Sequence, residues 1–235
     1  MRAAIIPARG GSKRIPQKNI KIFCGKPMIA WSIEAALQSG CFDRVIVSTD
    51  DNAIAAVAKE YGAEVPFIRP QELSDDFTGT VPVTKHAIEY LESQGETYDD
   101  IMCIYATAPF VQPKIITEAY EQFKSSQADY CFTATNYAAP IQRAFKLTEN
   151  KRAKMFNPEQ FNTRSQDLEE AYHDAGQFYW GNADAFKQLK PVLSEVASPY
   201  ILPRYLVQDI DTPDDWILAE LLYQALMANG NLDKQ

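Results

Sequence analysis

The chain has 235 residues, of which 46% are hydrophobic and 23% charged, and its formal net charge at pH 7 is −8. This length is enough for one sizeable α/β domain with a small appendage. The acidic balance argues against general binding to nucleic acid or to an anionic membrane, so a local cluster of cations favours a small anionic ligand. No apolar run approaches the roughly 20 residues of a membrane span, and no leader pattern opens the chain, so we expect a cytoplasmic protein.

The four cysteines, Cys24, Cys41, Cys103 and Cys131, are widely spaced and form no C-x-x-C pair. Only two histidines accompany them. This pattern predicts neither a zinc site nor a disulfide framework. We expect reduced thiols that lie mostly in the core.

The N-terminal segment joins a predicted strand, residues 3–7, to a glycine turn surrounded by cations. The loop after this strand contains Ala8, Arg9, Gly10, Gly11, Ser12, Lys13, Arg14, Lys18 and Asn19. Backbone N–H groups in such a turn can point at an anion while Arg and Lys neutralise its charge. The spacing matches neither a Walker A loop nor the G-x-G-x-x-G dinucleotide motif. We therefore predict a phosphate-binding loop of another type; a basic surface loop is the alternative.

Helices and strands alternate along the next hundred residues. Helices are predicted over residues 27–37, from Asp51 to Gly62, and over residues 81–93 and 113–125; strands are predicted over residues 44–49, 65–69, 101–105 and 130–135. Apolar, β-branched strands separated by helices predict a mainly parallel sheet covered on both faces. Ligands bind at the carboxyl ends of such strands, where the glycine turn and the polar loop of residues 74–80 also fall.

This alternation stops after Pro140. Residues 144–147 and 153–156 flank a polar turn and predict a hairpin. Residues 157–172 are polar and irregular, and their composition equally allows a disordered surface segment. A strand over 177–180 and a short helix over 182–189 follow.

The C-terminal region predicts a last strand over residues 205–211 and then a helix from Thr212-Pro213 to Gly230. The predicted packing face of this helix consists of Ile217, Leu218, Leu221, Leu222 and Ala225. On an extended strand, Asp209 and Asp211 point to the same side and form a candidate Mg²⁺ site. Taken alone, these carboxylates are at least as consistent with a strand end and a helix cap.

Three stretches carry a resemblance to a known family. They are Ile6 to Pro16 followed by Lys18-Asn19, Ile68-Arg69-Pro70-Gln71-Glu72-Leu73, and Gln208-Asp209-Ile210-Asp211-Thr212 with Asp215. In this order, and across most of the chain, they resemble the CMP-sialic acid synthetases, which are CTP-dependent cytidylyltransferases for nonulosonic acids. The resemblance implies a single domain, residues 1–235, with a Rossmann-like nucleotidyltransferase fold.

The resemblance also implies a reaction, in which the anomeric hydroxyl of a sugar attacks the α-phosphate of CTP. Arg9, Lys13, Lys18, Asn19 and Arg69 would hold the nucleotide, together with the backbone of residues 8–12. Asp209 and Asp211 would hold Mg²⁺. Arg9, Lys18 and the two carboxylates would assist catalysis by positioning the substrate and neutralising its charge.

The acceptor sugar is predicted from departures within this resemblance. Sialic acid members usually carry Gln-Pro-Thr-Ser-Pro where this chain has Tyr105-Ala106-Thr107-Ala108-Pro109, and the segment 172–181 also differs. Tyr105 does not reproduce the paired donor and acceptor of glutamine. These features resemble the pseudaminic acid cytidylyltransferases. The candidate sugar-binding residues are Tyr105, Ala106, Arg164, His173, Gln177 and Tyr179, with Arg164 as the partner of the sugar carboxylate.

Several alternatives remain open on the sequence. The acceptor could be N-acetylneuraminic or legionaminic acid, and an Asp-x-Asp motif also occurs in metal-dependent nucleotide-sugar glycosyltransferases. A nucleotide-binding protein without activity is a third possibility. Arg164 could be a solvated cation, and Arg69 part of a strand-end ion pair. The resemblance further implies a homodimer, formed through an extension at about residues 140–172.

Overall fold

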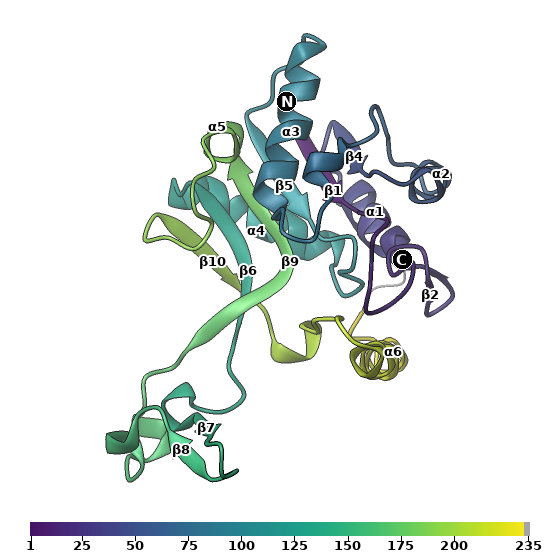
Figure 1. The fold of residues 1–235 in the computed structure, drawn as a ribbon. Coiled ribbons are helices and arrows are strands. Elements are labelled where there is room, and N and C mark those ends of the chain that lie inside the picture. The colour runs from purple at the N-terminus through teal and green to yellow at the C-terminus, as the bar shows by residue number, and fades with distance from the viewer. Residues whose placement is uncertain (233–235) are drawn as a thin grey trace.

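A six-stranded sheet forms the centre of the computed structural model, which describes residues 1–232 (Figure 1). The strand order is β10-β6-β9-β5-β1-β4. The strands are β1 (Arg2–Pro7), β4 (Arg44–Ser48), β5 (Asp100–Ile104), β6 (Tyr130–Asn136), β9 (Tyr172–Asn182) and β10 (Ala197–Ile201). β1 runs parallel to β4 and β5, and β10 runs parallel to β6, whereas β9 is antiparallel to both β5 and β6. The predicted mainly parallel sheet is confirmed.

Helices cover both faces of this sheet, as predicted. They are α1 (Met28–Gln38), α2 (Asn52–Glu60), α3 (Thr80–Ser93), α4 (Pro113–Ser126), α5 (Ala183–Lys187) and α6 (Pro213–Ala228). Side chains alternate along β1, so Ala4 and Ile6 join the core formed with α1, α2, α4 and α6. Ala3 and Ile5 join the opposite core, formed with α3 and α5. The two cores bury both faces of β1, and the loop that follows it carries several of the candidate site residues.

An extension leaves the main body between β6 and β9. It contains the hairpin of β7 (Phe145–Leu147) and β8 (Ala153–Met155), which pair antiparallel as predicted. The rest of the extension is irregular apart from three short 3₁₀ turns, Ile141–Arg143, Pro158–Gln160 and Ser165–Asp167. Figure 1 shows the extension projecting away from the sheet on the far ends of β6 and β9.

Two predicted strands do not form. Residues 65–69 form a loop that follows a single bridge to the sheet, the pair Ile46–Glu64, and the Arg69 N–H anchors this loop by donating to the Thr49 carbonyl at 2.8 Å. Residues 205–211 begin with the 3₁₀ turn Arg204–Leu206, because the edge position beside β6 is already taken by β10. The sequence analysis missed β10 and also the short pair β2 (Ile22–Phe23) and β3 (Lys26–Pro27).

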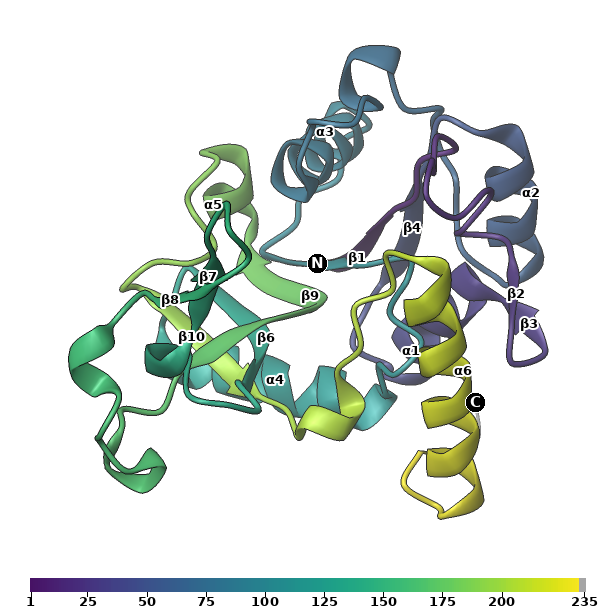
Figure 2. The same cartoon turned by 60° about the horizontal axis from the view of Figure 1, so that its bottom comes forward.

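Helix α6 begins where predicted, with a capping box between Thr212 and Asp215. Its predicted packing face is wrong, because Ile217, Leu218 and Leu221 are 57%, 54% and 61% exposed. The buried side chains are Trp216, Ala219, Tyr223 and Leu226. Trp216 and Tyr223 pack edge-on against Phe23 of β2, and this aromatic cluster sets the rotation of the helix. Figure 2 shows α6 beside the β2–β3 hairpin.

All four cysteines are free thiols, and Cys41, Cys103 and Cys131 are buried, which confirms their prediction as reduced core residues. Burial raises the pKa of the Cys103 thiol to about 11 and that of Cys131 to about 12, so both remain protonated. Within residues 1–232, no helix has the length and apolar character needed to cross a bilayer.

Candidate active site

A cavity of about 490 Å³ opens at the carboxyl ends of β1 and β5. It is lined by the loop after β1, by residues between Arg69 and Val83 at and before the start of α3, by the exit of β5 at residues 105–107, and by Asp211 before α6. This is the edge at which ligands bind in open α/β sheets, and it is where the sequence predicted the phosphate-binding loop. These segments are far apart in the sequence, and folding brings them together around the cavity.

Gly10 allows the loop after β1 to approach the start of α2. A Cβ atom at this position would lie 2.7 Å from Asp51 Oδ2, whereas one at Gly11 would meet open space. The Gly10 N–H donates to Asp50 Oδ1 at 3.0 Å. Of the two glycines, Gly10 is thus the one that the packing requires, because any side chain would push the loop away from Asp50 and Asp51.

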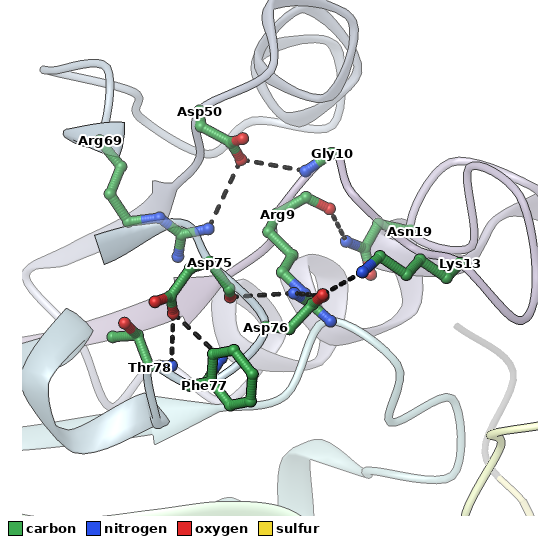
Figure 3. A network of polar contacts seen from close by, with 10 residues as sticks. All are labelled: Arg9, Gly10, Lys13, Asn19, Asp50, Arg69, Asp75, Asp76, Phe77 and Thr78. Carbon is green, nitrogen blue, oxygen red and sulfur yellow. Dashed lines mark hydrogen bonds and ion pairs between the residues drawn. The ribbon is translucent and has the colours of Figure 1, made fainter. Parts of the chain in front are cut away.

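Arg9 and Lys13 share one carboxylate on the opposite wall (Figure 3). Arg9 Nη1 lies 2.5 Å from Asp76 Oδ1 and donates to the Asp75 carbonyl at 2.9 Å. Lys13 Nζ pairs with the other oxygen, Asp76 Oδ2. The hydrogen bonds from Lys13 and Arg9 lower the pKa of Asp76, which therefore stays ionised at neutral pH.

Arg69 is the most enclosed cation of the cavity, with 4% of its surface exposed. Its Nη2 lies 3.5 Å from Asp50 Oδ1, and its Nε donates to Ser74 Oγ at 3.1 Å. Burial lowers the pKa of Arg69, and the nearby Asp50 carboxylate opposes that effect. Figure 3 shows Asp50 between Arg69 and the Gly10 N–H, so this carboxylate ties the Arg69 loop to the loop after β1.

Asn19 and Lys18 fix the far end of the loop after β1. Asn19 is 7% exposed, and its Nδ2 donates to the Arg9 carbonyl at 2.9 Å, which holds the loop closed on itself. Lys18 Nζ donates to the Ile210 carbonyl at 2.8 Å and lies 3.4 Å from Asp211 Oδ1. These contacts join the N-terminal loop to the segment that precedes α6.

Asp211 is shared by two cations, because Arg14 Nη2 lies 2.7 Å from its second oxygen. Asp209 is more exposed and does not line the cavity. Desolvation raises the pKa of Asp209, and the negative charge of Asp211 raises it further. Two neighbouring carboxylates that repel each other, with Asp211 on the cavity wall, fit a divalent cation. No cluster of three or more potential ligand side chains occurs in the described part of the chain, so any such cation would need further oxygens from a substrate.

On the β5 side, the cavity is lined by Tyr105 and Ala106, two of the residues predicted to bind the acceptor sugar. The Tyr105 hydroxyl lies 2.9 Å from that of Tyr179, which donates to Asp174 Oδ2 at 2.6 Å. Burial raises the pKa of both tyrosines, so their hydroxyls stay protonated. Because the Tyr179 proton points to Asp174, the Tyr179 oxygen accepts the hydrogen bond from the Tyr105 hydroxyl.

The other sugar-binding candidates lie elsewhere in the single chain, and none of them lines this cavity. Arg164 belongs to the extension, where it pairs with Asp167 and its side chain is 71% exposed. His173 contacts the Asp174 carbonyl and the Tyr137 ring. Gln177 is buried, and its Nε2 donates to the Leu206 carbonyl at 2.5 Å. Gln177 therefore supports the turn after β10, and Tyr179 acts on the cavity through Tyr105.

Comparison with known proteins agrees with this geometry. Residues 3–200 match the family model described as cytidylyltransferase. The chain belongs to the cytidylyltransferase family. It is 50% identical over 220 residues to a pseudaminic acid cytidylyltransferase of Campylobacter jejuni, covering 94% of this chain and 95% of that protein. It is 33% identical over 228 residues to the CMP-N,N'-diacetyllegionaminic acid synthase of Legionella pneumophila, with coverage of 94% and 95%.

Solved structures show that this cytidylyltransferase shares its fold with nucleotidyltransferases. A CMP:2-keto-3-deoxy-manno-octonic acid synthetase, solved in complex with CTP, superposes with a TM-score of 0.68 over 97% of this chain and 99% of the other. The sequence identity is 17%, so the likeness concerns the fold. The Rossmann-like nucleotidyltransferase fold expected from the resemblance is confirmed.

The cytidylyltransferase cavity also contains residues to which the sequence analysis gave no role. They are Asp75, Asp76, Thr78 and Thr80, with Asp50 and Asp174 one contact further out. Only their position in the sequence could have indicated a role, because polar loops at the carboxyl ends of strands line ligand sites. Their pairing with Arg9, Lys13 and Arg69 is a contact between distant segments, which no local pattern predicts.

Proposed function

We propose that this cytidylyltransferase transfers CMP from CTP to the anomeric hydroxyl of pseudaminic acid and releases pyrophosphate. The choice of sugar is based on the 50% identity, over nearly the full length of both chains, to the pseudaminic acid cytidylyltransferase of Campylobacter jejuni. Identity falls to 33% for the legionaminic acid relative and to 31% for an N-acylneuraminate cytidylyltransferase of Escherichia coli. Those sugars are the second choice.

The cations of the cavity suit the nucleotide. Arg9, Lys13, Lys18 and Arg69 line one continuous space, which matches the distributed charge of a triphosphate. In the reaction, the anomeric oxygen forms a bond to the α-phosphorus and the bond to the bridging oxygen of pyrophosphate breaks. The residues act by holding the reactants in line and by neutralising charge on the phosphate oxygens.

We propose Asp209 and Asp211 as the ligands of a Mg²⁺ ion. When bound, Mg²⁺ neutralises phosphate charge and aligns the phosphate oxygens. The repulsion between the two carboxylates and the location of Asp211 on the cavity wall support this assignment. Lys18 and Arg14 hold the Asp211 side chain in place through its two oxygens.

We also propose a homodimer formed through the extension, residues 140–172. Four large apolar side chains in this small unit, Phe145, Leu147, Phe156 and Phe161, are 58% to 68% exposed. Exposed apolar clusters of this kind mark protein interfaces. In such a dimer, Arg164 would reach the cavity of the partner subunit and contact the carboxylate of the sugar.

We place the reaction in the cytoplasm, because nucleoside triphosphates are made there. The four free cysteines are compatible with a reducing compartment. Cell fractionation of the native host, with antibody detection of the chain, tests this placement, and recovery in a periplasmic or membrane fraction would contradict it.

The proposed function is tested by measuring pyrophosphate release from the purified protein. Release should require CTP, Mg²⁺ and pseudaminic acid together, and a chelator should abolish it. Equal use of ATP or UTP would contradict the nucleotide assignment. Equal turnover of N-acetylneuraminic or N,N'-diacetyllegionaminic acid would contradict the sugar assignment alone. Consumption of a UDP-sugar or a CMP-sugar without CTP would favour a glycosyltransferase.

A further inference from the structure

The phosphate-binding loop is neutralised by carboxylates of its own chain. Asp76 pairs with Arg9 and Lys13 on one side, and Asp211 pairs with Arg14 and Lys18 on the other. Asp211 has a proposed role as a metal ligand. Asp76 has none in the reaction, although its carboxylate faces the centre of the cation cluster.

The contacts of Asp76 are those that a phosphate group would make. Each of its two oxygens contacts a different cation, Arg9 through Oδ1 and Lys13 through Oδ2 (Figure 3). Arg and Lys bind phosphate oxygens through the same N–H donors that they offer to a carboxylate. An anion that binds between Arg9 and Lys13 therefore has to displace Asp76.

The loop that carries Asp76 is shaped by its neighbour. Asp75 Oδ1 accepts the N–H groups of Phe77 and Thr78 at 3.0 and 2.7 Å, which forms a turn independent of Asp76. The Asp75 carbonyl meanwhile accepts from Arg9. Asp76 can therefore leave its two cations by a change of side-chain rotamer, without unfolding of the loop.

We propose that Asp76 is a built-in competitor for the phosphate groups of the nucleotide, whose carboxylate occupies their subsite between Arg9 and Lys13 until they bind. The identity of the anion as a nucleotide triphosphate rests on the proposed function; the competition itself rests on the two ion pairs. Asp76 thereby lowers the affinity of the site for phosphate groups. It also returns to Arg9 and Lys13 as pyrophosphate leaves, which favours release of that product.

The test compares Asp76→Asn with Asp184→Asn by calorimetric titration of inorganic tripolyphosphate and, separately, of CTP. Asp184 pairs with Lys187 on α5, lies away from the cavity and is 75% exposed, so its substitution makes the same change in net charge. Asp76→Asn should bind both ligands about two- to tenfold more tightly, the range that corresponds to the loss of exposed ion pairs. Asp184→Asn should bind them as the wild type does.

Steady-state kinetics provide a second test of the same proposal. Asp76→Asn should lower the KM for CTP and make pyrophosphate a stronger inhibitor by a similar factor. Asp76→Ser, which also removes the charge, should reproduce both effects and serves if the asparagine variant unfolds in circular dichroism. A residue with only a structural role would not tighten the binding of a ligand.

Unchanged or weaker binding of tripolyphosphate by both folded Asp76 variants would overturn the proposal, and so would equal tightening by Asp184→Asn. The experiments distinguish failure of this proposal from failure of the proposed function. Tripolyphosphate titration needs no sugar and no turnover, whereas the proposed function fails when wild-type protein binds CTP and yields no CMP-sugar.

Discussion

The cations that line the cavity of this cytidylyltransferase differ in how deeply their side chains are buried. Arg69 is nearly buried and is held by Asp50 and Ser74, so its guanidinium is presented to the cavity in one orientation. Lys13, by comparison, is largely exposed. Because a pre-oriented cation loses less entropy on binding than a mobile one, we expect Arg69 to contribute more than Lys13 to the proposed nucleotide affinity.

Replacing Arg69 by alanine should weaken CTP binding about 10- to 100-fold, as expected for the loss of a charged hydrogen-bonding partner. The Arg69→Lys variant should recover part of that loss, because it restores the charge without the planar fork. Calorimetric titration of CTP measures both. The exposed Lys59, at the end of α2, provides the matched control, and a similar loss in Lys59→Ala would show that net charge alone is responsible.

His86 makes stability depend on pH. Its ring packs against Phe67, its Nδ1 is buried without a hydrogen-bond partner, and desolvation lowers its pKa. Glu89 and Glu72 oppose this shift, whereas Arg69 adds to it. Below about pH 6.5 the unfolded chain binds a proton that the folded chain does not, so the free energy of unfolding should fall as the pH decreases toward the folded pKa.

Urea unfolding at pH 7.5 and pH 5.5 measures this effect, with His86→Gln as the comparison. The wild type should lose more stability between the two pH values than the variant does. An equal loss in both proteins would assign the pH dependence to other groups.

At the scale of helices and strands, the sequence correctly predicted most elements that have a clear local pattern of residues. Apart from the strand expected over residues 65–69, the predicted helices and strands up to residue 135 form, as do the hairpin at residues 144–156 and the cap at Thr212. Two of the errors have different physical causes. Residues 205–211 lose the sheet edge to β10, a partner that no local pattern identifies. On α6 the apolar residues nearly encircle the helix, so periodicity alone could not choose the buried side.

Two substitutions on α6 separate its two apolar faces. Trp216→Ala should lower the free energy of unfolding by about 3–5 kcal/mol, because it leaves a cavity among Phe23 and Tyr223. Leu221→Ala should change it by less than about 0.5 kcal/mol, as for an exposed residue. Chemical denaturation measures both values, and a larger loss for Leu221→Ala would contradict the observed rotation of the helix.

For the whole molecule, the candidate site shows the same difference between features that local sequence patterns predict and features that depend on contacts between distant segments. The cation loop was predicted because its residues are contiguous, from Arg9 to Asn19. Its closure by Asp76 and Asp50, and the relay from Tyr105 to Asp174, arise from contacts across the sheet edge and were not predicted. Arg164 lies on the extension, so its proposed role depends on assembly.

The proposed dimer predicts that charge placed on the extension will separate the subunits. Combined Leu147→Glu and Phe161→Glu substitutions should give a monomer in light scattering, because burying two carboxylates in an apolar interface is unfavourable. Leu221→Glu, on the exposed face of α6, is the control and should leave the dimer intact. A monomeric wild type at working concentrations would contradict the proposal, and so would an unchanged dimer in the double variant.

The most direct test of the central claim is a competition assay in which pseudaminic acid and N,N'-diacetyllegionaminic acid are supplied together with CTP and Mg²⁺. Mass spectrometry of the CMP-sugar products gives the ratio of the two kcat/KM values. We expect CMP-pseudaminic acid to exceed the other product by at least about tenfold, which corresponds to about 1.4 kcal/mol of discrimination. Equal amounts of the two products, or an excess of the legionaminic acid product, would contradict the account.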